Sequence, residues 1–309
     1  MDDVAARKNP PGAEAGVGVA DPGPPEHMLG RVLRPSELLD HARYRVADPA
    51  EALQPWIERY WSVRWDLEPG ERYRAATVSE PAVNLTAEWG DLRRAGITGP
   101  GLWVTGPVTR TRFDVELSGV GGVVGVKFRL GGTRAFTTGR PADIRDSTVA
   151  AERWFPGIDA ELAVPHDLDS AAEVLDRWLL SQAPEMTTGY ERVRLALAAM
   201  SDRAVTNLRA LAEAVAMSER GLQRLFLDHC GVGVKRILVR SRVIDAVAAL
   251  DRGWDGSLGD LATGLGWFDQ SHFTADFLRV TGYRPTEYLA LRNRARAGRS
   301  GSDAPTVER

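Results

Sequence analysis

The C-terminal part of the chain contains two stretches in which apolar residues recur every three or four positions. These positions are Leu208, Leu211, Ala212 and Val215 in the first stretch, and Leu258, Leu261, Ala262 and Leu265 in the second. Residues with this spacing share one face of an α-helix, so each stretch predicts a short amphipathic helix. The repetition indicates two copies of one supersecondary unit.

A second helix is predicted in each copy, after a tight turn. The capping residues are Ser218 and Asp269, the terminating glycines are Gly231 and Gly282, and the inward-facing residues are Leu222, Leu225, Phe226, Phe273 and Phe277. Ser and Asp are good N-caps, and glycine suits the left-handed end of a helix. Between the copies, the pattern from Val234 to Leu250 predicts one continuous helix, and Pro285 opens a final short helix.

Two short helices joined by a tight turn form a helix-turn-helix unit, whose second helix fits the major groove of B-DNA. Two such units tied by one helix can contact grooves about one helical turn apart. The repeat therefore predicts a DNA-binding domain. The alternative is a helical bundle in which the same leucines only form a core.

From Pro55 to Leu130 the pattern changes to short alternating or β-branched runs divided by glycine-rich turns. The runs cover residues 72–78, 82–87, 102–104, 112–117 and 123–128. They predict a β-rich domain in which Gly119 to Gly122 form a turn. After position 141 the pattern is helical, with one helix ending at Leu180 and another spanning Tyr190 to Met200.

The predicted fold class is α+β, with a β-rich domain followed by an all-α double helix-turn-helix domain. The expected divisions are a disordered tail at 1–43, a β-rich regulatory domain at 44–150, a helical connector at 151–200, the DNA-binding domain at 201–294 and a second disordered tail at 295–309. The tails are rich in proline, glycine or small polar residues, which bury too little apolar surface to offset the entropy of ordering.

Composition and charge narrow the class of protein. The 309 residues are 43% hydrophobic and 26% charged, without a run that approaches the roughly 18 apolar residues of a membrane span. The N-terminal segment lacks the apolar core of a secretory signal, and the single cysteine, Cys230, excludes an internal disulfide. We therefore expect a cytoplasmic protein. Residues 192–299 contain 17 Arg or Lys against 11 Asp or Glu, which suits a polyanionic partner but also an ordinary solvated surface.

Signals for catalysis or cofactor binding are weak. The segment Gly119 to Gly125 lacks the third glycine of a dinucleotide-binding loop. The five histidines are far apart and lack metal-ligand spacing, and the chain contains neither a nucleophile elbow nor a phosphate loop. We expect no enzyme, no metal site and no cofactor.

Several motifs in the C-terminal part resemble the AraC/XylS family of transcription regulators. They are Leu222-Gln223-Arg224-Leu225-Phe226 with Gly231, Gly266-Trp267-Phe268-Asp269-Gln270-Ser271-His272-Phe273, and Phe277 with Thr281-Gly282 and Pro285-Thr286-Glu287-Tyr288. A weaker resemblance, in Arg59-Tyr60-Trp61, Val126-Lys127-Phe128-Arg129 and Gly131-Gly132, links the N-terminal part to the β-rich sensor-like domain of one AraC subgroup. The resemblance implies a sequence-specific DNA-binding regulator.

The resemblance also implies which residues meet DNA. The base-contacting positions are Arg220, Gln223 and Arg224 in the first recognition helix, and Gln270, Ser271, His272 and Thr274 in the second. The phosphate-contacting candidates are Lys235, Arg236, Arg240 and Arg242, followed by Arg292, Arg294 and Arg296. Ala275 stands where the family commonly carries arginine, and Asp276 adds a negative charge nearby. This departure leaves open whether the second unit reads bases or mainly positions the protein on phosphates.

Double-stranded DNA is the predicted partner, while RNA polymerase, a small-molecule effector and a second copy of the chain stay open. The tryptophans Trp61, Trp65, Trp89 and Trp103 either line an effector pocket or belong to the core of the β-rich domain. Two other functions stay open as well: a protein-interaction module that never touches DNA, and a DNA-repair enzyme fused to an AraC-type domain. Alkyl-transfer repair needs an upstream nucleophilic cysteine, and residues 1–229 contain none.

Overall fold

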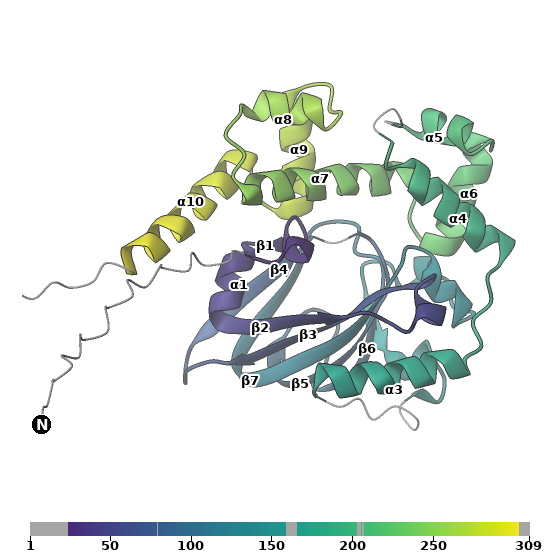
Figure 1. The fold of residues 1–309 in the computed structure, drawn as a ribbon, viewed down its shortest axis with the longest axis horizontal. Helices are drawn as coiled ribbons and strands as arrows, with labels where there is room; N and C mark the ends of the chain where they lie inside the picture. The colour runs from purple at the N-terminus through teal and green to yellow at the C-terminus, as the bar shows by residue number, and fades with distance from the viewer. Residues whose placement is uncertain (1–23, 79, 159–165, 203–204, 206, 303–309) are drawn as a thin grey trace, which may run out of the picture.

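The computed structural model describes residues 24–78, 80–158, 166–202, 205 and 207–302. Its strands are β1 (Val32–Leu33), β2 (Ala42–Ala47), β3 (Ile57–Asp66), β4 (Arg72–Thr77), β5 (Asn84–Arg93), β6 (Gly101–Thr105), β7 (Phe113–Phe128) and β8 (Thr148–Ala150). Its α-helices are α1 (Pro35–His41), α3 (Leu168–Ser181), α4 (Thr188–Ala199), α5 (Leu208–Ala214), α6 (Glu219–Cys230), α7 (Val234–Arg252), α8 (Leu258–Gly264), α9 (Gln270–Thr281) and α10 (Pro285–Ser302). A β-rich domain thus precedes a helical C-terminal part, as the α+β prediction requires (Figure 1).

The eight described strands form one antiparallel sheet, in which β7 is the central strand. The first half of β7 pairs with β4 and the second half with β3, while β5 lies along its other edge. Strand β1 pairs with the outer edge of β4, and β2 pairs with the outer edge of β3. On the other side of the sheet, β6 pairs with β5, and β8 pairs with β6. Figure 1 shows α7 and both helix-turn-helix units along one side of this domain and α3 on the opposite side.

Strand β7 runs without interruption through residues that were predicted to form a turn. Gly121 and Gly122 lie inside the strand, paired with Trp65 and Trp89 respectively. A Cβ on Gly121 would lie 2.3 Å from Cζ2 of Trp65, and a Cβ on Gly122 would lie 2.2 Å from Cζ2 of Trp89. The predicted turn at Gly119–Gly122 is therefore wrong, because these glycines admit tryptophan rings close to the backbone and do not reverse the chain.

Both predicted tails need correction. The expected disorder at 1–43 is wrong for residues 24–43, which include β1 and α1 and bury Met28 and Leu33. Residues 1–23 lie outside the described part of the chain. At the other end, α10 continues to Ser302, so the predicted tail at 295–309 begins as helix, while residues 303–309 lie outside the described part.

The helices of the predicted connector at 151–200 pack on the β-domain. Asp176 of α3 accepts hydrogen bonds from the hydroxyl of Tyr60 at 2.6 Å and from the backbone amide of Ala50 at 3.0 Å. The hydroxyl of Tyr190, at the start of α4, donates to the carbonyl oxygen of Pro55 at 2.7 Å. These contacts fix both helices against the segment that leads into β3.

The helix-turn-helix units share hydrophobic cores with the β-domain. One core runs from β3, β5 and β7 through α3 and α4 to Leu222 and Phe226 of α6. A second joins Leu33 and Val78, at the edge of the sheet, to Phe273 of α9 and its neighbours. Burial of continuous apolar surface therefore holds the helical part against the sheet. No helix in the described ranges has both the length and the apolar character needed to cross a bilayer.

Candidate nucleic-acid interface

The first helix-turn-helix unit consists of α5 and α6, and its local structure follows from its caps. Oγ of Ser218 accepts a hydrogen bond from the amide of Gly221 at 3.1 Å, and Gly231 ends α6 with a φ of 70°. Leu222 and Phe226 are fully buried on the inner face. The predicted base-contacting residues Arg220, Gln223 and Arg224 are all exposed on the outer face. Cys230 is buried in the core, and this burial raises the pKa of its thiol.

The second unit, α8 and α9, repeats this construction. Asp269 accepts a hydrogen bond from the amide of His272 at 2.8 Å, and Gly282 ends α9 with a φ of 76°. Phe273 and Phe277 are fully buried, with their ring centroids 5.5 Å apart. Of the predicted base-contacting residues, three are exposed and one is half-buried. The exposed residues are Gln270, Ser271 and His272, and the half-buried residue is Thr274.

Both recognition helices are anchored to the β-domain at their C-terminal ends. Nε of Arg145 donates to the carbonyl oxygen of Gly231 at 2.9 Å, and Nη1 of Arg112 donates to the carbonyl oxygen of Thr281 at 3.1 Å. The guanidinium of Arg112 also lies 4.7 Å from the ring centre of Tyr283. Partial negative charge gathers at a helix C-terminus, so both contacts are favourable. The N-terminal ends of α6 and α9 point away from the β-domain on the same side (Figure 1).

Helix α7 links the two units and meets the loop formed by residues 106–112, which we call the interdomain loop. Lys235 and Arg236 are exposed in the first turn of α7, although Nη1 of Arg236 also donates to Oγ1 of Thr109 at 3.1 Å. Arg240 is only 2% exposed, and its Nη2 donates to the carbonyl oxygen of Thr111 at 3.2 Å. The interdomain loop therefore covers part of the basic face of α7.

The expectation that Arg240 contacts phosphate needs correction, because its guanidinium is covered by protein in this structure. Burial lowers its pKa to about 10, although Asp146 and Glu80 act in the opposite direction. Arg242 is half-buried, and its Nη1 donates to the carbonyl oxygen of Gly266 at 3.1 Å, in the turn of the second unit. Sequence reasoning missed these roles because the helical pattern does not reveal what the β-domain places against α7.

A helix-turn-helix family profile, described as "Helix-turn-helix domain", matches residues 211–291. The match covers the second half of α5, both recognition helices, the linking helix and the start of α10. This part of the chain is an AraC-type helix-turn-helix domain. Such a domain is the DNA-binding part of a transcription regulator.

The β-domain has its own family match, and the whole chain has a distant likeness to solved structures. Residues 45–150 match a profile described as "Domain of unknown function (DUF6597)". A solved structure of ToxT from Vibrio cholerae is 9% identical and has a TM-score of 0.41, with 81% of this chain and 98% of that chain covered. ToxT with a bound unsaturated fatty acid is 12% identical, with a TM-score of 0.37 and coverage of 74% and 94%. A comparison with curated proteins finds no significant match.

The AraC-type domain exposes one residue at the tip of its second unit that sequence reasoning did not select. Phe268 directly precedes the cap Asp269, and 91% of its surface is exposed. The side chains of Phe273 and Phe277 fill the core of this unit, so Phe268 is not needed there. An exposed aromatic at the N-terminal end of a recognition helix can contact a thymine methyl group. In the sequence, Phe268 lies outside the helical spacing of the core residues Phe273 and Phe277, and this departure could have identified it as an exposed residue.

Asp276 has a structural partner in the AraC-type domain. Its Oδ2 accepts a hydrogen bond from Nε1 of Trp267 at 3.0 Å, and its Oδ1 pairs with Arg279. The carboxylate therefore ties the turn before α9 to the body of that helix. The negative charge of Asp276, which left base reading by the second unit open in the sequence, is paired within the helix with Arg279.

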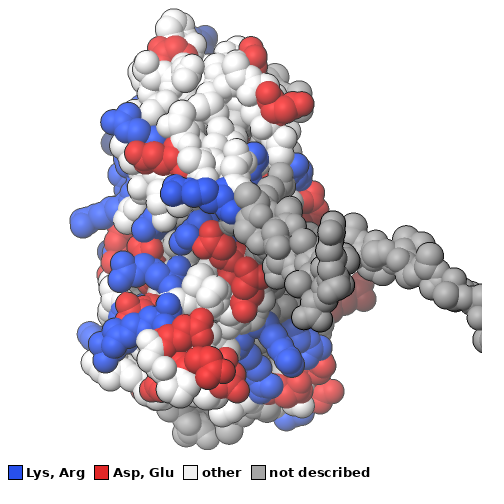
Figure 2. Space-filling view, turned by 90° about the vertical axis from the view of Figure 1, so that its left-hand side faces the viewer, with Lys and Arg blue, Asp and Glu red and all other residues white. Residues whose placement is uncertain are grey.

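The arginines of α10 differ in their surroundings. Arg292 donates to the carbonyl oxygen of Leu250 at the end of α7, and Nε of Arg294 donates to the carbonyl oxygen of Ala290 at 3.4 Å. The side chain of Arg296 lies outside the described part of the chain. Figure 2 shows the face beside α10, where basic and acidic groups are interspersed. Among the described residues of that face, the charges therefore do not form the field of a single sign that is expected of a DNA-binding surface.

Proposed function

We propose that this chain is a sequence-specific transcription regulator in which α6 and α9 enter successive major grooves of one DNA duplex. One observation carries the proposal: both helices are anchored at their C-terminal ends, their N-terminal ends lie on the same side of the molecule (Figure 1), and the polar residues near those ends are exposed. Arg220, Gln223 and Arg224 would read bases from α6, while Gln270, Ser271 and His272 would meet DNA from α9. The second group makes weaker contacts because it includes no arginine.

Phosphate contacts would come from the start of α7. Lys235 and Arg236 are exposed there, and the amide groups at this helix end favour anions. We propose that the β-domain senses an effector or brings two chains together, since it touches both recognition helices and the helix between them. We also propose that the chain contacts RNA polymerase when it is bound to DNA.

Selection of bound oligonucleotides from a random pool, with the full chain, tests the proposal directly. A regulator recovers a motif with two parts about one helical turn apart. A protein-interaction module recovers no motif, and that result would contradict the proposal.

Two variants separate base reading from phosphate binding. Arg224→Ala is expected to weaken binding of the selected site about 5- to 150-fold and to relax preference at one base pair. Lys235→Ala is expected to weaken binding to all DNA sequences alike. It should also reduce the slope of log affinity against log salt concentration by about one unit. Equal losses on selected and random DNA for Arg224→Ala would refute the readout role of this residue.

A further inference from the structure

The interdomain loop buries one arginine of the AraC-type domain and exposes an arginine of its own. Oγ1 of Thr109 accepts a hydrogen bond from Arg236 at 3.1 Å, and the carbonyl oxygen of Thr111 accepts one from Arg240 at 3.2 Å. Arg110 lies between these two threonines, so its backbone is held beside the first two turns of α7. The side chain of Arg110 is 85% exposed. The β-domain therefore adds a solvated cation next to the start of α7.

One carboxylate fixes the backbone of this loop. Asp146 accepts hydrogen bonds from the amide of Thr109 at 2.6 Å, from the hydroxyl of Thr109 at 2.8 Å and from the amide of Arg110 at 3.2 Å. Asp146 itself has a φ of 54°, a conformation that residues with a side chain adopt only where the surroundings enforce it. Only Nε of the Arg110 guanidinium comes within 3.6 Å of this carboxylate. The loop is thus rigid at its backbone, while the guanidinium extends into solvent.

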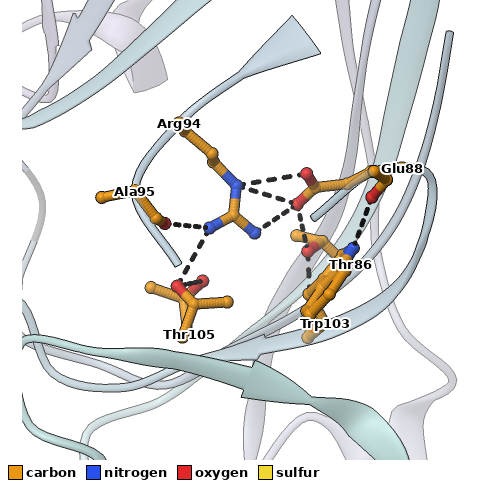
Figure 3. A network of polar contacts seen from close by, with 8 residues as sticks. Thr86, Glu88, Arg94, Ala95, Trp103 and Thr105 are labelled. Atoms are coloured by element: carbon orange, nitrogen blue, oxygen red, sulfur yellow. Dashed lines mark hydrogen bonds and ion pairs between the residues drawn. The ribbon is translucent and has the colours of Figure 1, made fainter. Parts of the chain in front are cut away.

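A buried polar network of the β-domain fixes the segment that carries Asp146 (Figure 3). Nη2 of Arg94 lies 2.6 Å from Oε1 of Glu88, and both side chains are almost completely buried. Oγ1 of Thr86 donates to the same carboxylate at 2.6 Å, and Nη1 of Arg94 donates to Oγ1 of Thr148 at 2.9 Å. Thr148 follows Asp146 by two residues. Satisfied buried networks are rigid, so the core of the β-domain determines where Arg110 is presented.

Positive charge is concentrated around this loop. Lys235 and Arg236 are exposed in the first turn of α7. Arg240 is buried but keeps its proton at neutral pH, because burial lowers its pKa only to about 10. The carboxylate of Asp146 is engaged by the three hydrogen bonds from the loop. Cations gathered on one surface repel one another, and an anion that binds among them relieves the repulsion.

We propose that Arg110 binds a phosphate group of the DNA backbone beside Lys235 and Arg236, so that the β-domain forms part of the DNA-binding surface. The inference rests on the proposed function, because the duplex must lie along α6 and the start of α7. A guanidinium donates to phosphate oxygens in a fork, which makes arginine a good phosphate ligand. A phosphate contact carries no sequence information, so Arg110 adds affinity for every duplex.

The salt dependence of DNA binding by the full chain tests the inference. For Arg110→Ala we expect about fivefold weaker binding at physiological salt, on the selected and on a random duplex alike, and a loss of about 0.9 from the slope of log affinity against log salt concentration. Arg110→Lys keeps the charge and should retain most of the slope. Fluorescence anisotropy with both labelled duplexes measures these effects.

The matched control removes the same charge elsewhere. Arg45 pairs with Asp169 of α3, on the side of the β-domain opposite α7, so Arg45→Ala should keep the wild-type affinity and slope (Figure 1). A wild-type slope in Arg110→Ala, or equal losses in both variants, would overturn the inference. Recovery of a motif by the wild-type chain does not depend on Arg110, so the proposed function would survive that outcome. A wild-type chain that binds no duplex would contradict both.

A chemical label at position 110 locates the contact independently of affinity. The single cysteine of the chain, Cys230, is buried, so Arg110→Cys supplies an accessible thiol. A DNA-cleaving iron chelate attached there should cut the selected duplex at a few neighbouring backbone positions, whereas the same chelate on Arg45→Cys should not cut. Absence of cleavage from position 110, or the same pattern from both positions, would overturn the inference.

Discussion

The side chain of Arg145 donates a hydrogen bond from Nε to the carbonyl oxygen of Gly231, over 2.9 Å. Gly231 caps the C-terminal end of the first recognition helix, and Arg145 belongs to the β-domain. Arg112 makes the equivalent contact with Thr281 at the end of the second. The β-domain therefore contacts both recognition helices at their C-terminal ends, and these contacts help to set the position of one helix relative to the other.

Removal of the first of these contacts is expected to loosen α6. Arg145→Ala should lower the free energy of unfolding by about 1 kcal/mol, because a hydrogen bond to a charged group is lost from a partly exposed site. Hydrogen exchange should accelerate at the C-terminal amides of α6. The control is Arg140→Ala, which removes an exposed local pair with Asp143 and should leave exchange in α6 unchanged. Equal exchange in both variants would show that Arg145 does not anchor the helix.

The close approach of tryptophan to β7 predicts a strong effect of a single methyl group. Gly121→Ala places a Cβ 2.3 Å from Cζ2 of Trp65 and 2.8 Å from the carbonyl oxygen of Trp89. We expect a loss of about 1 to 3 kcal/mol in urea unfolding, the usual range for overpacking. Gly264→Ala, where a Cβ would meet nothing within 4 Å, is the control and should not destabilise the protein. A loss of the same size in the control would contradict this explanation.

The half-buried carboxylate of Glu80 predicts how stability depends on pH. Burial acts to raise its pKa, but Lys127 and Arg31 outweigh burial and hold the pKa well below its usual range. A depressed pKa in the folded state stabilises the protein above the unfolded pKa, and this contribution is lost as the pH falls through the folded pKa. Unfolding free energy should therefore decrease below about pH 5.

The substitution Glu80→Gln should remove this contribution. We expect a loss of about 2 to 3 kcal/mol at neutral pH and a flatter curve in acid, because Lys127 keeps only Glu58 as its partner. Urea unfolding between pH 3 and pH 7 measures both effects, and Glu68→Gln, an exposed carboxylate, should reproduce the wild-type curve. A variant curve parallel to the wild type would rule Glu80 out as the source of the acid dependence.

The exposed ring of Phe268 predicts an effect on DNA binding without an effect on stability. With 91% of its surface exposed, the residue loses little buried area in Phe268→Ala. We expect about fivefold weaker binding to the selected site, equivalent to about 1 kcal/mol, and an unchanged melting temperature. Leu195→Ala removes a similarly exposed apolar side chain from α4 and should not alter DNA affinity. Fluorescence anisotropy with a labelled duplex measures both.

The sequence by itself determined the helical repeat and its outward residues. The caps Ser218 and Asp269, the terminal glycines Gly231 and Gly282, and the buried phenylalanines lie where the spacing predicts them. These features are local, because a cap, a left-handed glycine and a 3.6-residue period depend on residues a few positions apart. The exposure of Gln223 and Arg224 follows from the same period.

Only the tertiary structure decided what lies against these helices. In the sequence, the glycines of β7 look like a turn. In the structure they lie inside the strand and leave room for the rings of Trp65 and Trp89, which come from other strands. Arg240 looks like a solvated phosphate contact, yet Thr111 accepts its hydrogen bond and the β-domain covers it. Both contacts join residues far apart in the chain, and a local pattern carries no information about which distant surface will bury a side chain.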